Sequence, residues 1–433
     1  MVGIISSPTR GISGTAIVPA DKSISHRTVI FGALADGVTE VSNLLEGEDV
    51  LATVAAFRNM GVAIEGPDTG QLRISGSGKF GLQAPSRDVD LGNSGTSIRL
   101  LAGLLAGQRF ASRLTGDASL RRRPMGRVVD PLSQMGAVIK STDGCPPLDI
   151  QRSKGLTGFE YRLPVASAQV KSALLLAGLY AVGNTTLHEP APTRDHTERM
   201  LAGFSNAQWH AGSPIRSAGD ITLSGQRVSV PGDISSAAFL IVAATICPGS
   251  DLTLPGVGIN PTRSAVLDIL GMMGARIDVS AQRLESNEPV CDLRVRSAPL
   301  RGIDIPAESV ANAIDEFPII AIAAAAASGL TRLRGASELR VKESDRIAAV
   351  VQGLGALGID TVEYPDGMDI TGGSLGTGFV ESFGDHRIAM AFAVAGCISE
   401  GPIEIGEAEN IKTSFPSFLP LANSVGMSVK EQS

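Results

Sequence analysis

Six stretches of almost continuous apolar residues recur along the chain, each following a short opening of small and polar residues. An apolar stretch of helical length without a polar face predicts a helix that is buried on all sides. Each stretch leads through a Gly into a short strand-like segment, and then into a segment with one polar face, which predicts a helix at the surface. The six repeats open near Asp21, Gly92, Ala166, Gly232, Ala313 and Gly384.

Most of the polar-faced segments end in a Gly just past the last apolar turn, as at Gly61, Gly136, Gly274 and Gly358. That position is typical of a helix end in the left-handed conformation. Five steps from Gly61 to Gly426 average about 73 residues, which is too long for the common solenoid repeats. With short strand-like segments between the helices, the pattern predicts an α/β fold with mixed sheets.

The length of 433 residues is too great for one compact core, and six repeats divide most simply into two domains of three. Two similar Pro- and Asp-containing segments, 18–21 and 230–233, are the expected crossovers. We therefore predict an N-terminal domain of residues 20–231 and a C-terminal domain of residues 1–19 plus 232–433. The two crossovers form a two-strand hinge, and we expect an active site in a cleft that closes over its ligands.

The composition excludes several classes of protein. A net charge of −7 and only 4% aromatic residues argue against partners such as nucleic acid or an anionic membrane. The four cysteines have no CxxC spacing and the five histidines no paired-ligand spacing, so we expect neither a disulfide framework nor a metal site. The chain opens without a signal-peptide pattern, and its most apolar stretch is about half a membrane span. We expect a cytoplasmic monomer.

Basic and polar residues concentrate at the openings of the repeats, where the predicted helices begin. A helix start carries partial positive charge, so Lys and Arg are unfavourable there unless an anion neutralises both. This arrangement predicts bound phosphate or carboxylate, whereas a non-catalytic repeat scaffold would leave it unexplained. Two acids, Asp315 and Glu343, stand among the cations and are suited to accept a proton. Their structural alternatives are a helix N-cap for Asp315 and a surface ion pair with Arg346 for Glu343.

Nine motifs then become recognisable in order along the chain. They are DKSISHR (21–27), GNSGTSIRL (92–100), RRRPM (121–125), SAQVKSALLLAGL (167–179), RDHTERM (194–200), DEFP (315–318), LRVKESDR (339–346), GDHRIAM (384–390) and IKTSFPSF (411–418). With them the chain resembles the enolpyruvyl transferase family, and within it the 5-enolpyruvylshikimate-3-phosphate synthases. The resemblance implies a two-domain inverted α/β barrel of six βαβαββ-type repeats. It also implies two anionic substrates, shikimate-3-phosphate and phosphoenolpyruvate, with no metal and no organic cofactor.

The resemblance also implies roles for individual residues. The shikimate-3-phosphate site is expected to comprise Lys22, Ser23, Arg27, Ser167, Ala168, Gln169, Arg194, Asp315 and Lys342. The phosphoenolpyruvate site is expected to comprise Lys22, Gly95, Arg123, Gln169, Arg346, Arg387 and Lys412. Asp315 resembles the base at the shikimate 5-hydroxyl. Lys22 and Glu343 are both candidates for protonating the enolpyruvyl methylene, and the sequence leaves that choice open.

Some positions depart from the enterobacterial and plant pattern of this family. Ala168 replaces a Ser, Ser94 replaces an Ala, and Leu100 stands where a Pro is usual. Gly95, without a Cβ, leaves room for the inhibitor glyphosate, whereas Leu100 is expected to tilt the same helix into the site, so we expect partial tolerance of glyphosate. Arg194 in its RDHTER setting is similar to the branch often called class II.

The nearest alternative is a UDP-N-acetylglucosamine enolpyruvyl transferase. That family has a reactive Cys five residues before an Arg-Pro pair, where this chain has Ala118 before Arg123 and Pro124. An RNA-end-processing relative of similar fold would leave the paired acids unexplained.

Overall fold

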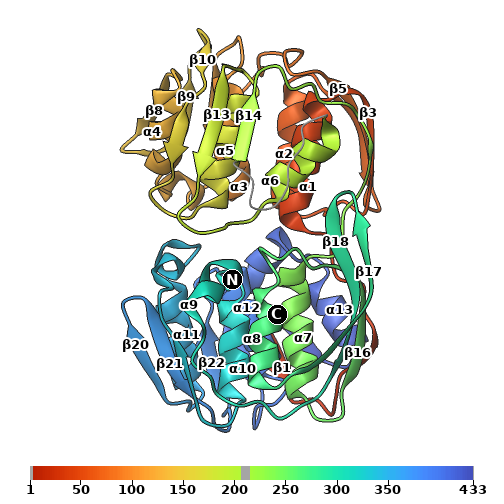
Figure 1. The fold of residues 1–433 in the computed structure, drawn as a ribbon. Helices are drawn as coiled ribbons and strands as arrows, with labels where there is room; N and C mark the ends of the chain where they lie inside the picture. Colours follow the sequence, from red (N-terminus) through yellow and green to blue (C-terminus); the bar gives the residue numbers. More distant parts are fainter. Residues whose placement is uncertain (1–2, 206–214, 433) are drawn as a thin grey trace. The chain divides into compact units, whose positions relative to one another are not determined.

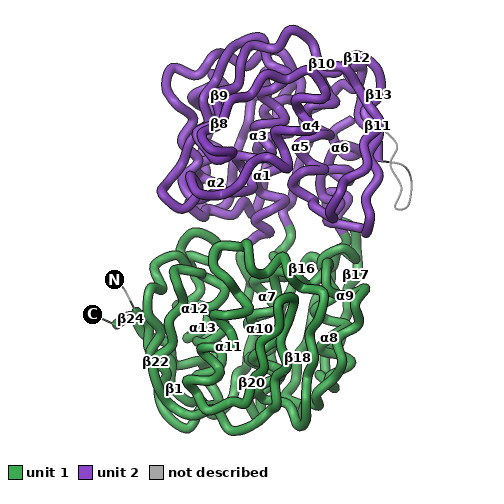
Figure 2. The backbone as a smooth tube through the Cα atoms, turned by 90° about the vertical axis from the view of Figure 1, so that its left-hand side faces the viewer, with its two compact units in different colours: residues 1–19, 231–284, 289–433 green, residues 20–230, 285–288 purple. Residues whose placement is uncertain are grey.

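The computed structural model describes residues 3–205 and 215–432, and the chain divides into two compact units (Figure 2). Unit 1 comprises Met1–Pro19, Pro231–Leu284 and Pro289–Ser433, and unit 2 comprises Ala20–Val230 and Glu285–Glu288. Each unit combines helices and strands (Figure 1), so the mixed α/β class predicted from the repeats is confirmed.

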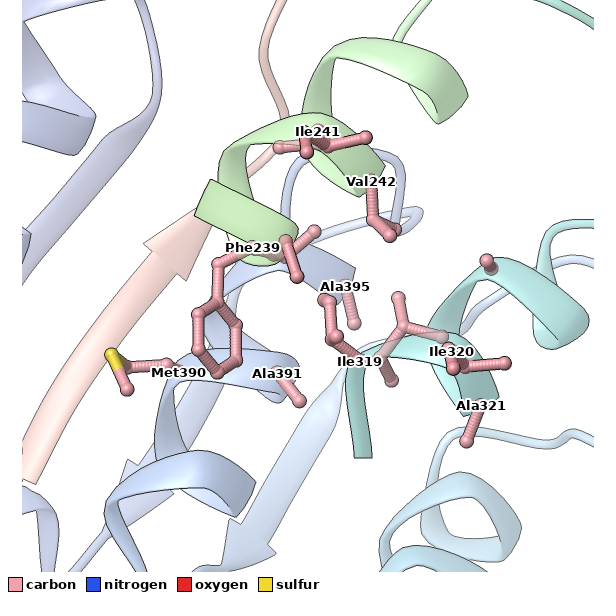
Figure 3. Close-up of a cluster of buried hydrophobic side chains, with 14 of the residues drawn as sticks. Phe239, Ile241, Val242, Ile319, Ile320, Ala321, Met390, Ala391 and Ala395 are labelled. Atoms are coloured by element: carbon pink, nitrogen blue, oxygen red, sulfur yellow. The ribbon is translucent and has the colours of Figure 1, made fainter. Parts of the chain in front are cut away.

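The apolar stretches form the inner helices of the two units. In unit 2 these are α1 (Lys22–Leu34), α3 (Gly95–Ala106) and α5 (Ala168–Gly178), and in unit 1 they are α7 (Ile234–Ile246), α10 (Phe317–Ala325) and α12 (His386–Ala395). Every residue of α10 is buried, as a sequence without a polar face predicts. In unit 1, Phe239, Ile319 and Met390 come from three different inner helices and gather in one apolar cluster (Figure 3). Burying side chains of this size contributes about 1.5–3 kcal/mol each.

The polar-faced segments form the outer helices. They are α2 (Glu48–Asn59), α4 (Gly126–Gln134), α6 (His196–Phe204), α8 (Ala265–Met273), α11 (Arg346–Ala356) and α13 (Phe418–Ser424). In α2, Val50, Val54 and Phe57 are buried, while Glu48 and Arg58 are exposed. The glycines that follow five of these helices all have a positive φ, between 83° and 107°, so the predicted left-handed ends are confirmed. They are Gly61, Gly136, Gly274, Gly358 and Gly426.

Short helices complete the described segments. They are η1 (Leu120–Arg122), α9 (Ala307–Val310), η2 (Ala311–Ala313), η3 (Ser337–Val341) and η4 (Ala408–Thr413).

Unit 2 contains three main sheets and a two-stranded one. Their orders are β15-β3-β5-β4, β6-β7-β9-β8, β11-β13-β14 and β10-β12. In each of the three main sheets one pair is parallel (β15 with β3, β6 with β7, β11 with β13) and the other described pairs are antiparallel. The strands are β3 (Asp36–Ser42), β4 (Ala63–Asp68), β5 (Gln71–Ser77), β6 (Val89–Asp90), β7 (Ser112–Thr115), β8 (Ile139–Thr142), β9 (Cys145–Ile150), β10 (Leu156–Thr157), β11 (Glu160–Arg162), β12 (Ala181–Val182), β13 (Asn184–His188), β14 (Ile215–Ala218) and β15 (Arg227–Ser229).

Unit 1 also contains three sheets, ordered β17-β18-β16-β2, β19-β21-β20 and β22-β23-β1-β24. The N-terminal residues complete two of them, because β1 pairs antiparallel with β23 and β24 while β2 pairs parallel with β16. The tip of the β17–β18 hairpin, Glu285–Glu288, clusters with unit 2. The strands are β1 (Gly3–Ser7), β2 (Ser13–Thr15), β16 (Asp251–Gly258), β17 (Arg276–Glu285), β18 (Glu288–Arg296), β19 (Leu330–Leu333), β20 (Thr361–Tyr364), β21 (Gly367–Thr371), β22 (Gly378–Glu381), β23 (Ile403–Gly406) and β24 (Ser428–Gln432).

Two further expectations concern the whole chain. Cys145, Cys247, Cys291 and Cys397 are free cysteines in the structure. Within residues 3–205 and 215–432, no helix has both the length and the apolarity to cross a bilayer.

Candidate active site

Capping side chains fix the start of five inner helices, and through them the positions of the polar residues that follow. Each cap oxygen accepts a hydrogen bond from a backbone N–H of the first turn, which satisfies one of the free donors there. The caps are Asp21, Ser94, Ser167, Asp233 and Asp385. In α10 the cap position is occupied by Glu316, which makes no such bond, and Asp315 lies one residue earlier. The alternative in which Asp315 is a helix N-cap is therefore wrong.

Lys22 is the first residue of α1 and is held by a carboxylate from α2. Its Nζ lies 2.5 Å from Asp49 Oδ2, and the Asp49 side chain is only 9% exposed. Lys22 itself is 23% exposed, so its ammonium group stays partly accessible to a ligand. Its carboxylate partner was not found from the sequence, because a contact between residues on two different helices depends on how the helices pack.

Arg27, on the next turn of α1, is buried among uncharged acceptors. Its Nε donates to Thr197 Oγ1 at 2.7 Å, its Nη2 to Ser172 Oγ at 2.7 Å, and its Nη1 to the carbonyl of Ser23 at 2.9 Å. Burial lowers the pKa of Arg27 to about 10, against the opposing effect of Glu198 and Asp21. The guanidinium therefore remains charged at neutral pH.

The starts of α3 and α5 are joined through Gln169. Arg99 Nη1 donates to Gln169 Oε1 at 3.0 Å and to the carbonyl of Gly95 at 3.0 Å. The amide nitrogen of Gln169 donates to Thr96 Oγ1 at 3.1 Å. Gly95 and Gln169, both predicted site residues, are thus fixed relative to each other through Arg99, a basic residue at the opening of the second repeat that the sequence assigned to neither substrate. Leu100 is fully buried in the core of unit 2.

Arg123 approaches the same helix start from the loop after η1. Its Nη2 donates to Asn93 Oδ1 at 2.5 Å, and Asn93 Nδ2 in turn donates to Asp117 Oδ2 at 2.8 Å. A Cβ built on Gly95 would lie 2.8 Å from Arg123 Nη1 and 2.8 Å from Arg99 Nη1. The missing side chain of Gly95 is therefore what allows two guanidinium groups to meet at the start of α3.

In unit 1, Arg346 is the centre of the candidate site. It is only 1% exposed and contacts three carboxylates: Glu343 Oε2 at 2.6 Å, Asp385 Oδ2 at 2.8 Å and Asp315 Oδ1 at 3.3 Å. Burial opposes the charge of Arg346, but these carboxylates outweigh it and raise the pKa of the guanidinium. The predicted ion pair between Glu343 and Arg346 is present, but Arg346 is buried, so it is not a surface pair.

Asp315 is surrounded by cations on several sides. Lys342 Nζ lies 3.4 Å from Asp315 Oδ1, and Arg387 Nη1 donates to the Asp315 backbone carbonyl at 2.8 Å. A carboxylate next to cations is held in its ionised form, ready to accept a proton. Asp385 is fully buried. Burial raises its pKa, but the charge of Arg346 outweighs that effect, so the pKa is lowered and the group stays ionised.

Lys412, in η4, lies apart from this cluster. Its Nζ is 3.7 Å from Glu431 Oε1 in β24, and its side chain is 63% exposed. The same short helix is tied to the start of α12, since Asn410 Nδ2 donates to the carbonyl of Gly384.

The structure thus distributes the predicted site residues over two sets. In unit 2 lie Lys22, Ser23, Arg27, Gly95, Arg123, Ser167, Ala168, Gln169 and Arg194. In unit 1 lie Asp315, Lys342, Glu343, Arg346, Arg387 and Lys412. Unit 2 supplies cations and helix starts suited to anions, and unit 1 supplies acids held by cations.

Comparisons with known proteins all identify the same family. The family model for EPSP synthase (3-phosphoshikimate 1-carboxyvinyltransferase) matches residues 7–421 of this chain. The chain belongs to the EPSP synthase family. Among curated EPSP synthase relatives, the 3-phosphoshikimate 1-carboxyvinyltransferase of Acidithiobacillus ferrooxidans is 59% identical, over 99% of this chain and 98% of the relative. The enzyme of that name from Methylococcus capsulatus is 57% identical, over 98% of both chains.

Solved structures agree. EPSP synthase from Acinetobacter baumannii superposes with a TM-score of 0.91 at 49% sequence identity, covering 100% of both chains. The enolpyruvyl transferase NikO from Streptomyces tendae reaches a TM-score of 0.79 at 17% identity, covering 100% of this chain and 99% of the other, which shows a shared fold alone. The two-domain inverted α/β barrel expected from the sequence is therefore the fold of this chain.

Proposed function

We propose that this chain transfers the enolpyruvyl group of phosphoenolpyruvate to the 5-hydroxyl of shikimate-3-phosphate, giving 5-enolpyruvylshikimate-3-phosphate and phosphate. The observation that carries the proposal is the buried Arg346, which gathers Asp315 and Glu343 beside Lys342 in a chain of the EPSP synthase family. A carboxylate base held among cations is what a proton transfer from an alcohol requires.

The residues of unit 2 would chiefly bind the anionic groups of the substrates. Ser23, Arg27, Ser167, Ala168, Gln169 and Arg194 are assigned to shikimate-3-phosphate, and Lys22, Gly95, Arg123 and Gln169 to phosphoenolpyruvate. The hydrogen-bond acceptors of Arg27 and Arg123 given above are uncharged oxygens, which leaves both cations suited to attract an anion. Both substrates carry phosphate and carboxylate, and bringing them together requires such offsetting charge.

The residues of unit 1 would carry the proton transfer. A proton adds to C3 of phosphoenolpyruvate, C2 becomes electrophilic, and the 5-oxygen of shikimate-3-phosphate bonds to C2 while Asp315 takes the hydroxyl proton. The resulting tetrahedral ketal phosphate loses phosphate, and loss of a proton from C3 restores the double bond. Lys22 and Glu343 remain the two candidates for the C3 proton, and Lys342, Arg346, Arg387 and Lys412 would stabilise the anionic groups. We further propose that the enzyme acts as a cytoplasmic monomer.

Phosphate release from phosphoenolpyruvate tests this function directly. Purified protein should release phosphate with shikimate-3-phosphate as acceptor, and not with UDP-N-acetylglucosamine. Release with only the nucleotide sugar would establish the alternative transferase, for which Ala118 leaves no reactive Cys at the expected position. Release with neither acceptor would overturn the proposal.

A further inference from the structure

A buried lysine on α5 has no part in the proposed reaction. Lys171 is only 1% exposed, and its Nζ lies 2.7 Å from Glu198 Oε1 and 3.0 Å from Glu189 Oε2. The same Nζ donates to the backbone carbonyl of Thr193 at 3.3 Å. Both carboxylates are themselves buried, at 3% and 10% exposure. A charged side chain is almost never buried to this extent unless it is paired, so its position in the fold is closely constrained.

The partners of Lys171 lie at the two ends of one short segment. Glu189 follows directly after β13, and Glu198 lies in the first turn of α6. Thr193 Oγ1 also donates to Glu189 Oε1, which closes the segment on itself. Lys171 therefore fastens residues 189–198 to α5 at three points, and the residue after Thr193 is Arg194.

The immediate neighbours of Lys171 and Glu198 form a second layer of contacts. Ser172, next to Lys171, and Thr197, next to Glu198, are hydrogen-bonded to each other at 2.7 Å. Both accept from the guanidinium of Arg27. The charge of Arg194 acts on the pKa of Arg27 in the lowering direction, so the two guanidinium groups lie close enough to repel. Holding such cations near each other requires a fixed framework.

We propose that Lys171 is a positioning residue for the part of the shikimate-3-phosphate site that contains Arg194. Through Glu189, Thr193 and Glu198 it holds Arg194 in register with the start of α5, where Ser167 and Gln169 lie. The inference rests on the proposed function and adds to it a residue that touches neither substrate. The competing view is that the lysine and its carboxylates only stabilise unit 2.

Kinetics of Lys171→Met separate the two views. Methionine keeps the length of the side chain but removes the three contacts. If Lys171 positions Arg194, the KM for shikimate-3-phosphate should rise at least about tenfold, since a misplaced charged hydrogen bond costs that much. The KM for phosphoenolpyruvate and the kcat at saturation should change less than about threefold, because only ground-state binding of one substrate is weakened. Arg194→Ala should show the same selectivity with a larger effect.

A matched control lies at the other end of the same helix. Lys79 Nζ donates to the carbonyl of Leu179, which caps the C-terminal end of α5, and to the carbonyl of Gly219. Lys79→Met should lower the melting temperature and leave both KM values unchanged. Lys171→Arg keeps the charge and should restore most of the affinity. Equal increases in both KM values in Lys171→Met, or a selective increase in Lys79→Met, would overturn the proposal.

Two measures keep the test decisive. Lys171→Met leaves two buried carboxylates without their cation, so if this variant does not fold, Lys171→Met/Glu198→Gln replaces it with the same expected selectivity. If the wild type itself gives no turnover, the proposed function fails, but the fastening of residues 189–198 by Lys171 can still be tested. Amide hydrogen exchange of residues 189–198 should then be faster in the Lys171 variant than in Lys79→Met. Equal rates would show that Lys171 does not hold this segment in place.

Discussion

Arg27 in unit 2 and Arg346 in unit 1 are both buried, but their electrostatic surroundings differ. Arg27 in unit 2 is 3% exposed and is held by two hydroxyls and a carbonyl, whereas Arg346 in unit 1 is 1% exposed and contacts three carboxylates. Burial lowers the pKa of Arg27 to about 10, while the carboxylates raise that of Arg346 despite burial. Arg27 hydrogen-bonds to neutral acceptors while Glu198 and Asp21 act on its charge, whereas Arg346 has its charge offset by carboxylates in direct contact.

The difference suggests a division of labour between the units. Neutral acceptors orient the Arg27 guanidinium without neutralising it, so its positive charge can attract a phosphate that binds beside it. The carboxylates around Arg346 offset its charge, so Arg346 attracts a further anion less strongly, while the carboxylates are available to accept protons. On this view unit 2 mainly binds and unit 1 mainly performs the chemistry. Five variants test the division, from the largest expected effect to the smallest.

Lys22→Met should have the largest effect, because Lys22 combines both roles. It lies in unit 2, yet its ammonium is paired with Asp49 as the cations of unit 1 are paired with acids. If it both binds phosphoenolpyruvate and moves a proton, the variant should lose turnover altogether. Steady-state phosphate release measures this, with Lys79→Met as the lysine control. A kcat near the wild-type value would restrict Lys22 to binding.

Asp315→Asn should reduce kcat by about 10²–10⁴-fold, the usual contribution of a positioned base. Asparagine preserves the shape and the backbone carbonyl that Arg387 contacts, so both KM values should change only a few-fold. Asp304→Asn is the matched control, since Asp304 pairs with Arg332 at the surface of the same unit. An unchanged kcat with a raised KM for shikimate-3-phosphate would make Asp315 a ligand and would place the chemistry elsewhere.

Stability should distinguish the two arginine environments. Asp385→Asn leaves Arg346 without its fully buried partner and should cost about 3–5 kcal/mol of unfolding free energy. Thr197→Val removes one neutral acceptor from Arg27 and should cost about 1–3 kcal/mol. Urea unfolding, followed separately for each unit by local probes, provides the comparison. Equal costs would mean that the charge of the acceptor does not distinguish the units.

The pH dependence of the Asp385 contribution follows from its lowered pKa. A carboxylate whose folded pKa is below the unfolded value of about 3.9 contributes stability that is complete above that value and lost as the pH falls through the folded pKa. The stability difference between the wild type and Asp385→Asn should therefore be constant from about pH 6 to 8 and shrink only in acid. A stability difference that shrinks near neutral pH would show that a group other than Asp385 makes this contribution.

The sequence predicted the repeats, the buried and surface helices and the residues at each helix start, because these depend on local periodicity and capping. Asp21 and Asp385, for example, are each followed at once by the basic or polar residues of a motif. It did not predict Asp49 beside Lys22, nor Lys171 with Glu198, because those residues are brought together only by helix packing. The β17–β18 hairpin, whose tip clusters with unit 2, was missed as well, since the residues of β17 are mostly exposed and give no buried face to recognise.

Sequence reasoning was also incomplete about Gly95, which was expected to line the phosphoenolpyruvate site and, without a Cβ, to leave room there for glyphosate. The structure shows that a Cβ there would first meet Arg123 Nη1 and Arg99 Nη1, both at 2.8 Å. Contacts this short require the neighbour to shift, which is possible because both atoms end flexible side chains. Which guanidinium shifts determines which substrate is affected.

Gly95→Ala should therefore have the smallest effect of the five, and a selective one. Arg123 is bonded to Asn93 through Nη2, so it can pivot about that bond and move Nη1 away, whereas Arg99 would have to break the two bonds that its Nη1 makes. Arg123 should yield, and the KM for phosphoenolpyruvate should rise about two- to tenfold, a cost below one lost charged hydrogen bond. Gly126→Ala is the matched control, because Gly126 also begins a helix of unit 2 and its Cβ would meet only Asp130 at an ordinary 3.6 Å. A larger increase in the KM for shikimate-3-phosphate would show that Arg99 and Gln169 moved instead, and that the start of α3 is held less firmly than its hydrogen bonds indicate.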